Sequence, residues 1–125
     1  MAVVIDKLLQ EPALPLILQR LQAILAQEQE RRQYFYDVVT EEQKAEFING
    51  EIFVHSPVKL RHNSVSSSIA QLLRAYVMTH DLGYVGHEKL LVTLTRNDYE
   101  PDVCFFGQAK AQHFQPDQMK FPAPD

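Results

Sequence analysis

Cysteine and glycine are scarce in this sequence, and each shortage excludes a class of protein. Cys104 is the only cysteine among 125 residues, so a small fold held together by disulfide bonds is excluded. The four glycines exclude collagen-like chains and glycine-rich linkers. A Gly-x-Ser-x-Gly elbow and a glycine-rich phosphate loop are also absent. No two of the five histidines are four residues apart, so their spacing does not predict a zinc-binding helix.

Excess positive charge and long hydrophobic runs are missing as well. The net charge is −4, which excludes nucleic-acid binding by bulk positive charge alone. Residues 59–96 nevertheless carry five basic and two acidic side chains between acidic flanks, a pattern that fits either local phosphate contact or ordinary surface variation. The most apolar stretch, Leu14–Ala26, is too short and too polar to span a bilayer. We therefore expect no membrane contact, and the single free cysteine suggests a cytoplasmic protein.

Two stretches have the apolar spacing of an amphipathic helix. The first predicts a helix over residues 14–33, within an N-terminal helical segment, residues 1–33, that precedes a domain of residues 34–125. The second predicts a helix over residues 64–80, which Gly83 is placed to end. The apolar stripe of the second helix consists of Val65, Ile69, Leu72, Leu73, Tyr76 and Val77.

The dipeptide Asn49-Gly50 predicts a β-hairpin, because both positions of such a turn need positive φ. The turn joins residues 45–48 to residues 51–55 and places Ile48 opposite Glu51. One face of the hairpin is then apolar and consists of Ala45, Phe47, Ile52 and Val54. The other face combines carboxylates with bulky side chains, namely Glu46, Ile48, Glu51, Phe53 and His55.

The second half of the chain predicts another pair of strands, residues 90–95 and 101–106, around a turn at 96–99. The tail, residues 112–125, contains three prolines and predicts a loop with a helical turn at 117–120. The order helix, hairpin, helix, hairpin and tail predicts an α+β (mixed α/β) fold, with one sheet covered by the second predicted helix.

Carboxylates are the side chains best suited to chemistry in this sequence. Asp102 follows Pro101 and opens an apolar strand, so its carboxylate must stay hydrated or find a cation. Hard divalent cations prefer such oxygen ligands, and Glu46 or Glu51 on the predicted hairpin is the natural second contributor. A plain turn is the alternative, because Pro-Asp is a common turn dipeptide and occurs three times here.

Several motifs in combination resemble one family, the Uma-type putative restriction endonucleases, which are abundant in cyanobacteria and long classed as a domain of unknown function. The resemblance covers roughly residues 31–125. It is carried by Ala45-Glu46-Phe47-Ile48-Asn49-Gly50-Glu51-Ile52, Ser56-Pro57, Arg61-His62, Glu100-Pro101-Asp102-Val103 and the ending Lys120-Phe121-Pro122-Ala123-Pro124-Asp125.

This resemblance implies a PD-(D/E)XK restriction-endonuclease-like fold, a mixed sheet flanked by helices, and a metal-dependent DNA endonuclease. Asp102 and Glu46 would be its catalytic residues and its ligands for Mg²⁺ or Mn²⁺. DNA would be the partner, and a homodimer is expected because cutting both strands usually needs two sites. Contacts to nucleic acid are expected from His62, Arg61, Lys59, Lys89 and Arg96.

One departure from the family pattern concerns the second half of the site. The family continues after the second Pro-Asp into a strand that carries an essential Glu, followed by a Lys, whereas this sequence stops at Asp125. Two other segments combine an acid with a lysine, but neither replaces the missing half of the site. Glu42-Gln43-Lys44 precedes Pro101-Asp102 in the chain, and Asp117-Gln118-Met119-Lys120 has the wrong spacing. We therefore expect a domain incomplete at its C-terminus, with weak or no metal binding and no activity of its own. An inactive remnant or interaction module is the alternative, as is a small oligomer that pairs through the helix of residues 14–33.

Overall fold

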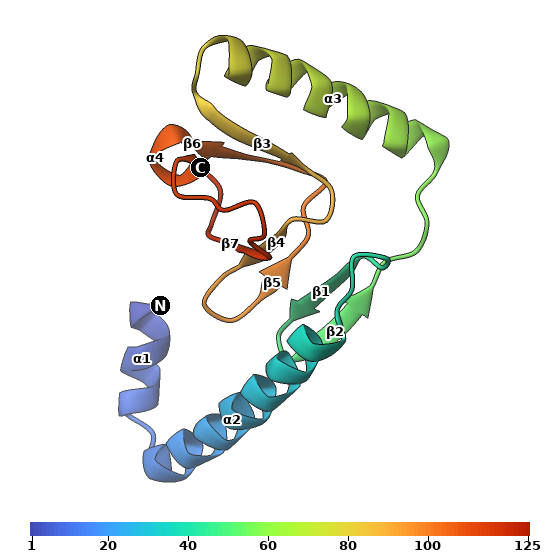
Figure 1. Ribbon diagram of the computed structural model, residues 1–125. Helices are drawn as coiled ribbons and strands as arrows, with labels where there is room; N and C mark the ends of the chain where they lie inside the picture. The colour runs from blue at the N-terminus through green and yellow to red at the C-terminus, as the bar shows by residue number, and fades with distance from the viewer.

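A computed structural model describes all residues, 1–125, and shows four helices and two sheets (Figure 1). The helices are α1 Ala2–Leu9, α2 Leu14–Val38, α3 Leu60–Thr79 and α4 Gln108–Ala111. The strands are β1 Ala45–Ile48, β2 Glu51–Val54, β3 Gly83–His87, β4 Leu91–Thr93, β5 Asp98–Tyr99, β6 Val103–Gly107 and β7 Lys120–Phe121. A five-stranded mixed sheet has the order β2-β1-β5-β4-β7, and β3 pairs with β6 alone. The predicted α+β class is confirmed.

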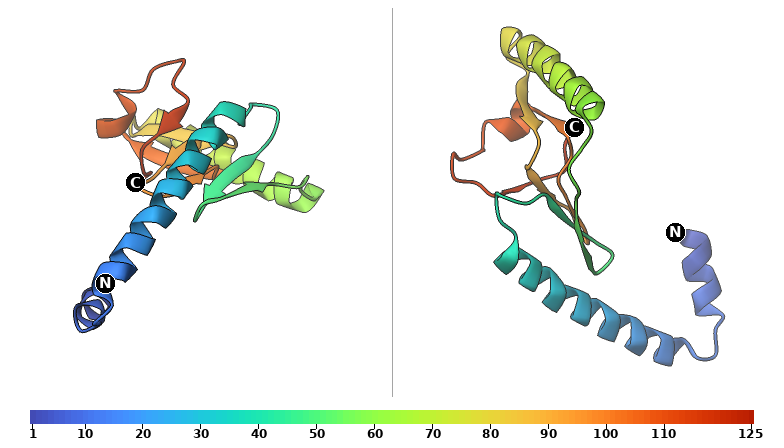
Figure 2. Two further views of the ribbon diagram at one scale, coloured as in Figure 1. Left: turned by 90° about the horizontal axis from the view of Figure 1, so that it is seen from below. Right: turned by 90° about the vertical axis from the view of Figure 1, so that its right-hand side faces the viewer.

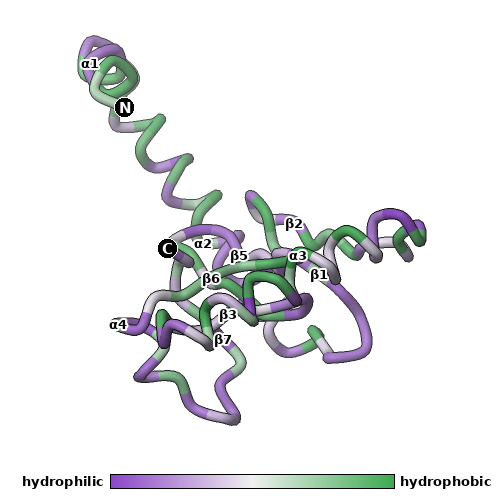
Figure 3. Tube along the Cα trace, turned by 90° about the horizontal axis from the view of Figure 1, so that it is seen from above, coloured by the Kyte–Doolittle hydropathy of each residue, from purple (hydrophilic) through white to green (hydrophobic).

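α1 and the first half of α2 extend away from the sheets (Figure 2). The chain exposes 9400 Å² of surface, whereas a compact protein of 14.4 kDa exposes about 6,800 Å². The helix predicted over residues 14–33 is present and continues to Val38, so the predicted division between residues 33 and 34 falls inside α2. α1 was not predicted from the sequence, and it buries none of its residues. Many residues of α1 and of the first half of α2 are hydrophobic (Figure 3), and their large apolar side chains are exposed.

The predicted hairpin is confirmed residue by residue. Ile48 pairs with Glu51 and Ala45 with Val54, and Asn49 and Gly50 both have positive φ. Its apolar face is buried only on β1, because Phe47 packs against Phe35 of α2. β2 is the edge strand, and all four of its residues are exposed. The apolar face predicted from the register is therefore buried on β1 and exposed on β2.

The predicted second hairpin is wrong, because its two strands belong to different sheets. β4 pairs with β5 and, in parallel, with β7, whereas β6 pairs with β3. The sequence analysis missed β3 because it placed Gly83 at a helix end. Gly83 instead starts the strand with a φ of +142°, and a Cβ there would overlap the carbonyl oxygen of Phe106. The glycine thus permits the close approach of β3 to β6.

The second predicted helix is present as α3, but it packs differently from expectation. It packs mainly on β3 rather than on the five-stranded sheet. The face turned inward carries Ser66, Ala70 and Val77, and the small side chains among them allow a close approach to the strand. Most of the predicted apolar stripe is exposed, Leu72 to 73%.

A second small core lies beneath the tail, which the sequence analysis had assigned to a loop. β7 brings Phe121 beside Val92, Cys104 and Phe106. Phe114 meets both phenylalanines edge-on, with ring centroids 5.0 Å from Phe106 and 5.2 Å from Phe121. Such edge-to-face pairs stabilise beyond their buried area, so the tail is an integral part of the fold.

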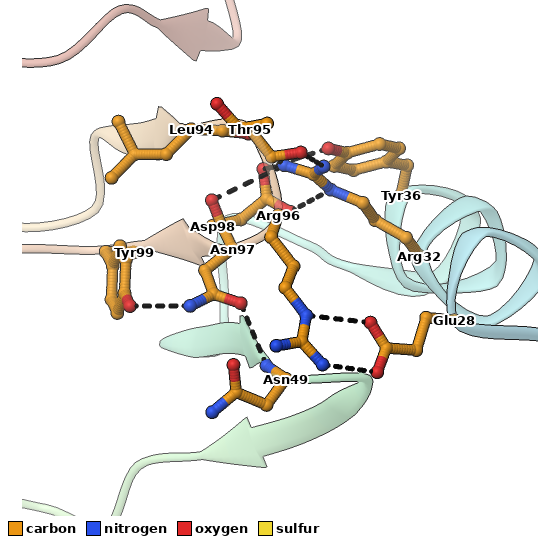
Figure 4. A network of polar contacts seen from close by, with 10 residues as sticks. All are labelled: Glu28, Arg32, Tyr36, Asn49, Leu94, Thr95, Arg96, Asn97, Asp98 and Tyr99. Atoms are coloured by element: carbon orange, nitrogen blue, oxygen red, sulfur yellow. Dashed lines mark hydrogen bonds and ion pairs between the residues drawn. The ribbon is translucent and has the colours of Figure 1, made fainter. Parts of the chain in front are cut away.

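A buried ion pair fastens α2 to the sheet (Figure 4). Arg32 donates to the two carboxylate oxygens of Asp98 over 2.7 and 3.1 Å, and the Tyr36 hydroxyl donates to the same carboxylate over 2.9 Å. The hydrogen bond to Asp98 raises the pKa of Arg32 above its usual value. One turn earlier, Glu28 forms a bidentate pair with Arg96 over 2.9 and 2.6 Å.

Candidate functional site

The carboxylate of Asp102 lies where three segments meet, between β5 and β6, beside the loop before β1 and at the start of α3. Lys44 Nζ donates to Asp102 Oδ1 over 2.6 Å, and His62 Nε2 lies 2.9 Å from Oδ2. The hydrogen bond from Lys44, aided by His62, lowers the pKa of Asp102 below its usual value. The side chain is therefore a charged carboxylate with both oxygens occupied.

Glu46 on β1 is held by two partners near this point. Its Oε2 lies 2.8 Å from His55 Nε2, and its Oε1 accepts a hydrogen bond from the backbone N–H of Glu100 over 2.8 Å. Glu46 and Asp102 line one hollow of about 350 Å³. The residues around it are mostly polar and comprise Lys44, Glu46, His55, Ser56, Val58, His62, Glu100, Pro101 and Asp102. The two predicted carboxylates thus share one polar hollow, and Glu51 does not line it.

Glu100 adds a third carboxylate that the sequence analysis did not single out. Its side chain is almost fully buried, and its Oε2 has no hydrogen-bond partner. Burial raises the pKa of Glu100 above its usual value, against the opposing effects of the Ala45 backbone N–H and of Lys89 and Lys44. Its position two residues before Asp102 was the available signal, because alternate residues of an extended segment point to the same side.

A larger hollow of about 530 Å³ adjoins the first and shares His62 and Asp102 with it. Arg61, Val65, Ser66, Ile69 and Val103 complete its lining. Arg61 and His62 lie in the first turn of α3, where backbone N–H groups and the helix dipole favour anions. This surface is therefore chemically suited to a phosphate group next to the carboxylates.

The predicted basic residues do not gather on one surface. Arg61 and His62 border Asp102, and Lys59 is exposed just before α3. Lys89 donates to the backbone carbonyl of Glu41 and lines a separate small hollow that also contains Glu100. Arg96 is paired with Glu28 beside α2 and borders neither of the two hollows at Asp102.

The acidic side chains of the site have the oxygen ligands that a hard divalent cation prefers, but they are not arranged around one. Carboxylate oxygens from Glu46, Glu100 and Asp102 are the ligands that Mg²⁺ and Mn²⁺ prefer, and the partnerless Oε2 of Glu100 is a vacant donor. No group of three or more His, Cys, Asp or Glu side chains is arranged to hold a metal ion. At Asp102, Lys44 and His62 already occupy both oxygens.

Lys44 is the second residue of the site that the sequence analysis passed over. Glu42-Gln43-Lys44 has the residue types of the (D/E)-x-K motif, which follows the Pro-Asp motif in the family pattern. In this chain it precedes Pro101-Asp102. The structure nevertheless brings the Lys44 ammonium to Asp102 across 58 positions of sequence. Glu42 is exposed and lines neither hollow, so the structure places only the lysine of this triplet in the site.

Comparisons with known proteins bear on the fold and on the family of the chain. No helix has the length and apolar character needed to cross a membrane, and no curated protein matches the chain. A crystal structure described as a putative nuclease belonging to DUF820 from Anabaena variabilis ATCC 29413 is similar in fold, with a TM-score of 0.62 and 18% sequence identity. The match covers 72% of this chain and 51% of that chain, so the chain spans about half the length of this relative. Residues 19–125 match the family Uma2, described as putative restriction endonuclease, and because this match spans most of the sequence, the chain belongs to that family.

Proposed function

We propose that the chain is part of a metal-dependent DNA endonuclease, which hydrolyses phosphodiester bonds. The observation that carries this proposal is the shared hollow of Glu46 and Asp102, bordered by Lys44 and His62, in a chain of the Uma2 family. Carboxylates beside cationic side chains are the arrangement that binds a divalent cation next to a phosphate group.

Each residue has a role that follows from its chemistry. Asp102 and Glu46 would hold Mg²⁺ or Mn²⁺, and the bound ion would lower the pKa of a water molecule and neutralise charge on the phosphate. Arg61 and His62, at the start of α3, would orient the phosphodiester in the adjoining hollow. Lys59 would add phosphate contacts that position DNA without reading its sequence.

The 125-residue chain alone is expected to be inactive. It spans about half the length of the solved relative, and loss of a single electrostatic contributor to a site typically costs about 100- to 1000-fold in rate. Plasmid cleavage with Mn²⁺ by the isolated chain, abolished by Asp102→Asn, would overturn this expectation.

The proposed activity is tested on the product of the complete gene, read past the codon for Asp125. Nicking of supercoiled plasmid with Mg²⁺ or Mn²⁺ is expected, with loss on Asp102→Asn and Glu46→Gln. Glu51→Gln is the matched control, because Glu51 is exposed on the same hairpin and lies outside the hollow. Cleavage that survives Asp102→Asn, or a complete product that does not cut, refutes the proposal.

A second candidate, an interaction module, is favoured by the exposed helices. Leu18, Leu21 and Leu25 lie along the first half of α2 and are about half exposed. Burial of such a stripe between two copies would give the homodimer expected for cutting both strands. Sedimentation over a concentration series should then show association that Leu21→Gln weakens, and a monomer at every concentration would exclude this candidate.

A further inference from the structure

We infer that Glu100 is a third ligand for the divalent cation, and that Lys44 occupies the cation's place at Asp102 until the cation binds. This inference rests on the proposed function for the choice of a divalent cation. It adds two residues, Glu100 and Lys44, which the family resemblance did not assign to the site.

The first step concerns the environment of Glu100. The residue is 5% exposed, and its Oε2 is fully buried without a hydrogen-bond partner. A buried carboxylate oxygen without a partner is unfavourable, because burial removes the water that would otherwise solvate it. A cation at Oε2 would supply the missing interaction.

The second step is that Glu100 is fixed relative to the two expected ligands. Its backbone N–H donates to Glu46 Oε1 over 2.8 Å, so Glu46 and Glu100 are joined directly. Pro101 restricts the backbone between Glu100 and Asp102. All three acidic residues line the same hollow of about 350 Å³. A cation in this hollow would therefore lie beside three acidic residues on directly connected segments, with Glu100 also bordering the small hollow next to Lys89.

Asp102 already has a cationic partner in this structure. Lys44 Nζ lies 2.6 Å from Asp102 Oδ1. Its single positive charge therefore neutralises the carboxylate that the cation would need as a ligand. Its ammonium is carried on a flexible four-carbon chain, and the side chain keeps 25% of its surface exposed. A doubly charged ion can therefore displace Lys44 into solvent, which frees Asp102 Oδ1 for the ion.

The test is calorimetric titration of the full 125-residue chain with Mn²⁺ alone, using four variants. Glu100→Gln is expected to weaken binding by about tenfold or more, because a ligand is lost. Lys44→Met is expected to tighten binding several-fold, since the competing charge is removed. Asp102→Asn should abolish binding, and the exposed control Glu51→Gln should leave it unchanged.

Folding is controlled within the same set of variants. Glutamine has the shape of glutamate and keeps the backbone N–H that Glu100 donates to Glu46, so Glu100→Gln is expected to keep the far-UV circular dichroism of the wild type. Equal Mn²⁺ affinity of the wild type and a folded Glu100→Gln overturns the role of Glu100. Unchanged or weaker binding by Lys44→Met overturns the exchange.

The outcomes also separate this inference from the proposed function. If Asp102→Asn abolishes Mn²⁺ binding but Glu100→Gln does not, the inference fails while the proposed metal ligand Asp102 stands. A wild-type chain that binds no Mn²⁺ overturns the inference, whereas the proposed nuclease activity is decided separately by DNA cleavage with the complete gene product.

Discussion

Replacing Asp98 with asparagine tests whether the buried ion pair holds α2 on the sheet. Asp98 is fully buried and accepts hydrogen bonds from Arg32 and from Tyr36. Asparagine has a similar shape but no charge, and its amide group brings donors where the partners are also donors. The substitution therefore leaves the Arg32 guanidinium, itself buried, without a counter-charge.

The expected loss is large for a chain of this size. Removing one partner of a buried ion pair typically costs about 3–5 kcal/mol, whereas the whole free energy of unfolding of a native protein is about 5–15 kcal/mol. Tyr36→Phe, which removes only one hydrogen bond to Asp98, should cost about 1 kcal/mol. Replacing the pair together, by Arg32→Met with Asp98→Leu, should restore much of the stability, because no buried charge is left unpaired.

Equilibrium unfolding in urea, followed by far-UV circular dichroism, measures these differences. The order of stability should be wild type, Tyr36→Phe and then Asp98→Asn, with the double replacement above Asp98→Asn. A loss below about 1 kcal/mol for Asp98→Asn would refute the reasoning. It would mean that the pair contributes little once the cost of burying its charges is included.

Three further predictions follow from single contacts. The hydrogen bond from Arg96 lowers the pKa of Glu28, so the stabilising effect of the pair is present above the usual pKa and is lost as the pH falls through the lowered value. The melting temperature of Glu28→Gln should therefore be below that of the wild type at pH 7 and equal to it in acid. A difference that persists in acid would contradict this prediction. Gly83→Ala should destabilise by about 1–3 kcal/mol in urea, because Gly83 has positive φ and its Cβ would overlap the Phe106 carbonyl; an equally stable variant would contradict the close approach. Burial raises the pKa of Cys104, so a disulfide reagent should label it at pH 8 far more slowly in the native chain than in urea, and equal rates would contradict its burial.

Local sequence signals predicted the elements whose contacts are local. The Asn49-Gly50 turn fixed the register of β1 and β2 correctly, and apolar spacing identified most of α2 and α3. These signals depend on neighbouring residues, so they are readable without the rest of the fold.

Pairing between distant segments was not readable in this way. β7 has only two residues and pairs with β4 from the far end of the chain, and β3 begins with a glycine that also suits a helix end. The same limit applied to the site. Asp102 and Glu46 were recognised from the sequence because they are acidic residues within motifs. Lys44 becomes relevant only through its contact with Asp102, 58 positions away. Glu100 becomes relevant through its contact with Glu46, 54 positions away.

The last prediction concerns the packing of α3, because two interpretations of this helix predict opposite orders of stability for two substitutions. A buried apolar stripe would make Leu72 a core residue, whereas the structure exposes 73% of Leu72 and only 2% of Ala70. Leu72→Ser should therefore change the free energy of unfolding by less than about 0.5 kcal/mol. Ala70→Leu should cost about 1–3 kcal/mol, because the larger side chain is forced against β3. If urea unfolding gives the opposite order, the helix packs through its large apolar stripe, and the small-residue face of Ser66 and Ala70 is not its contact with the sheet.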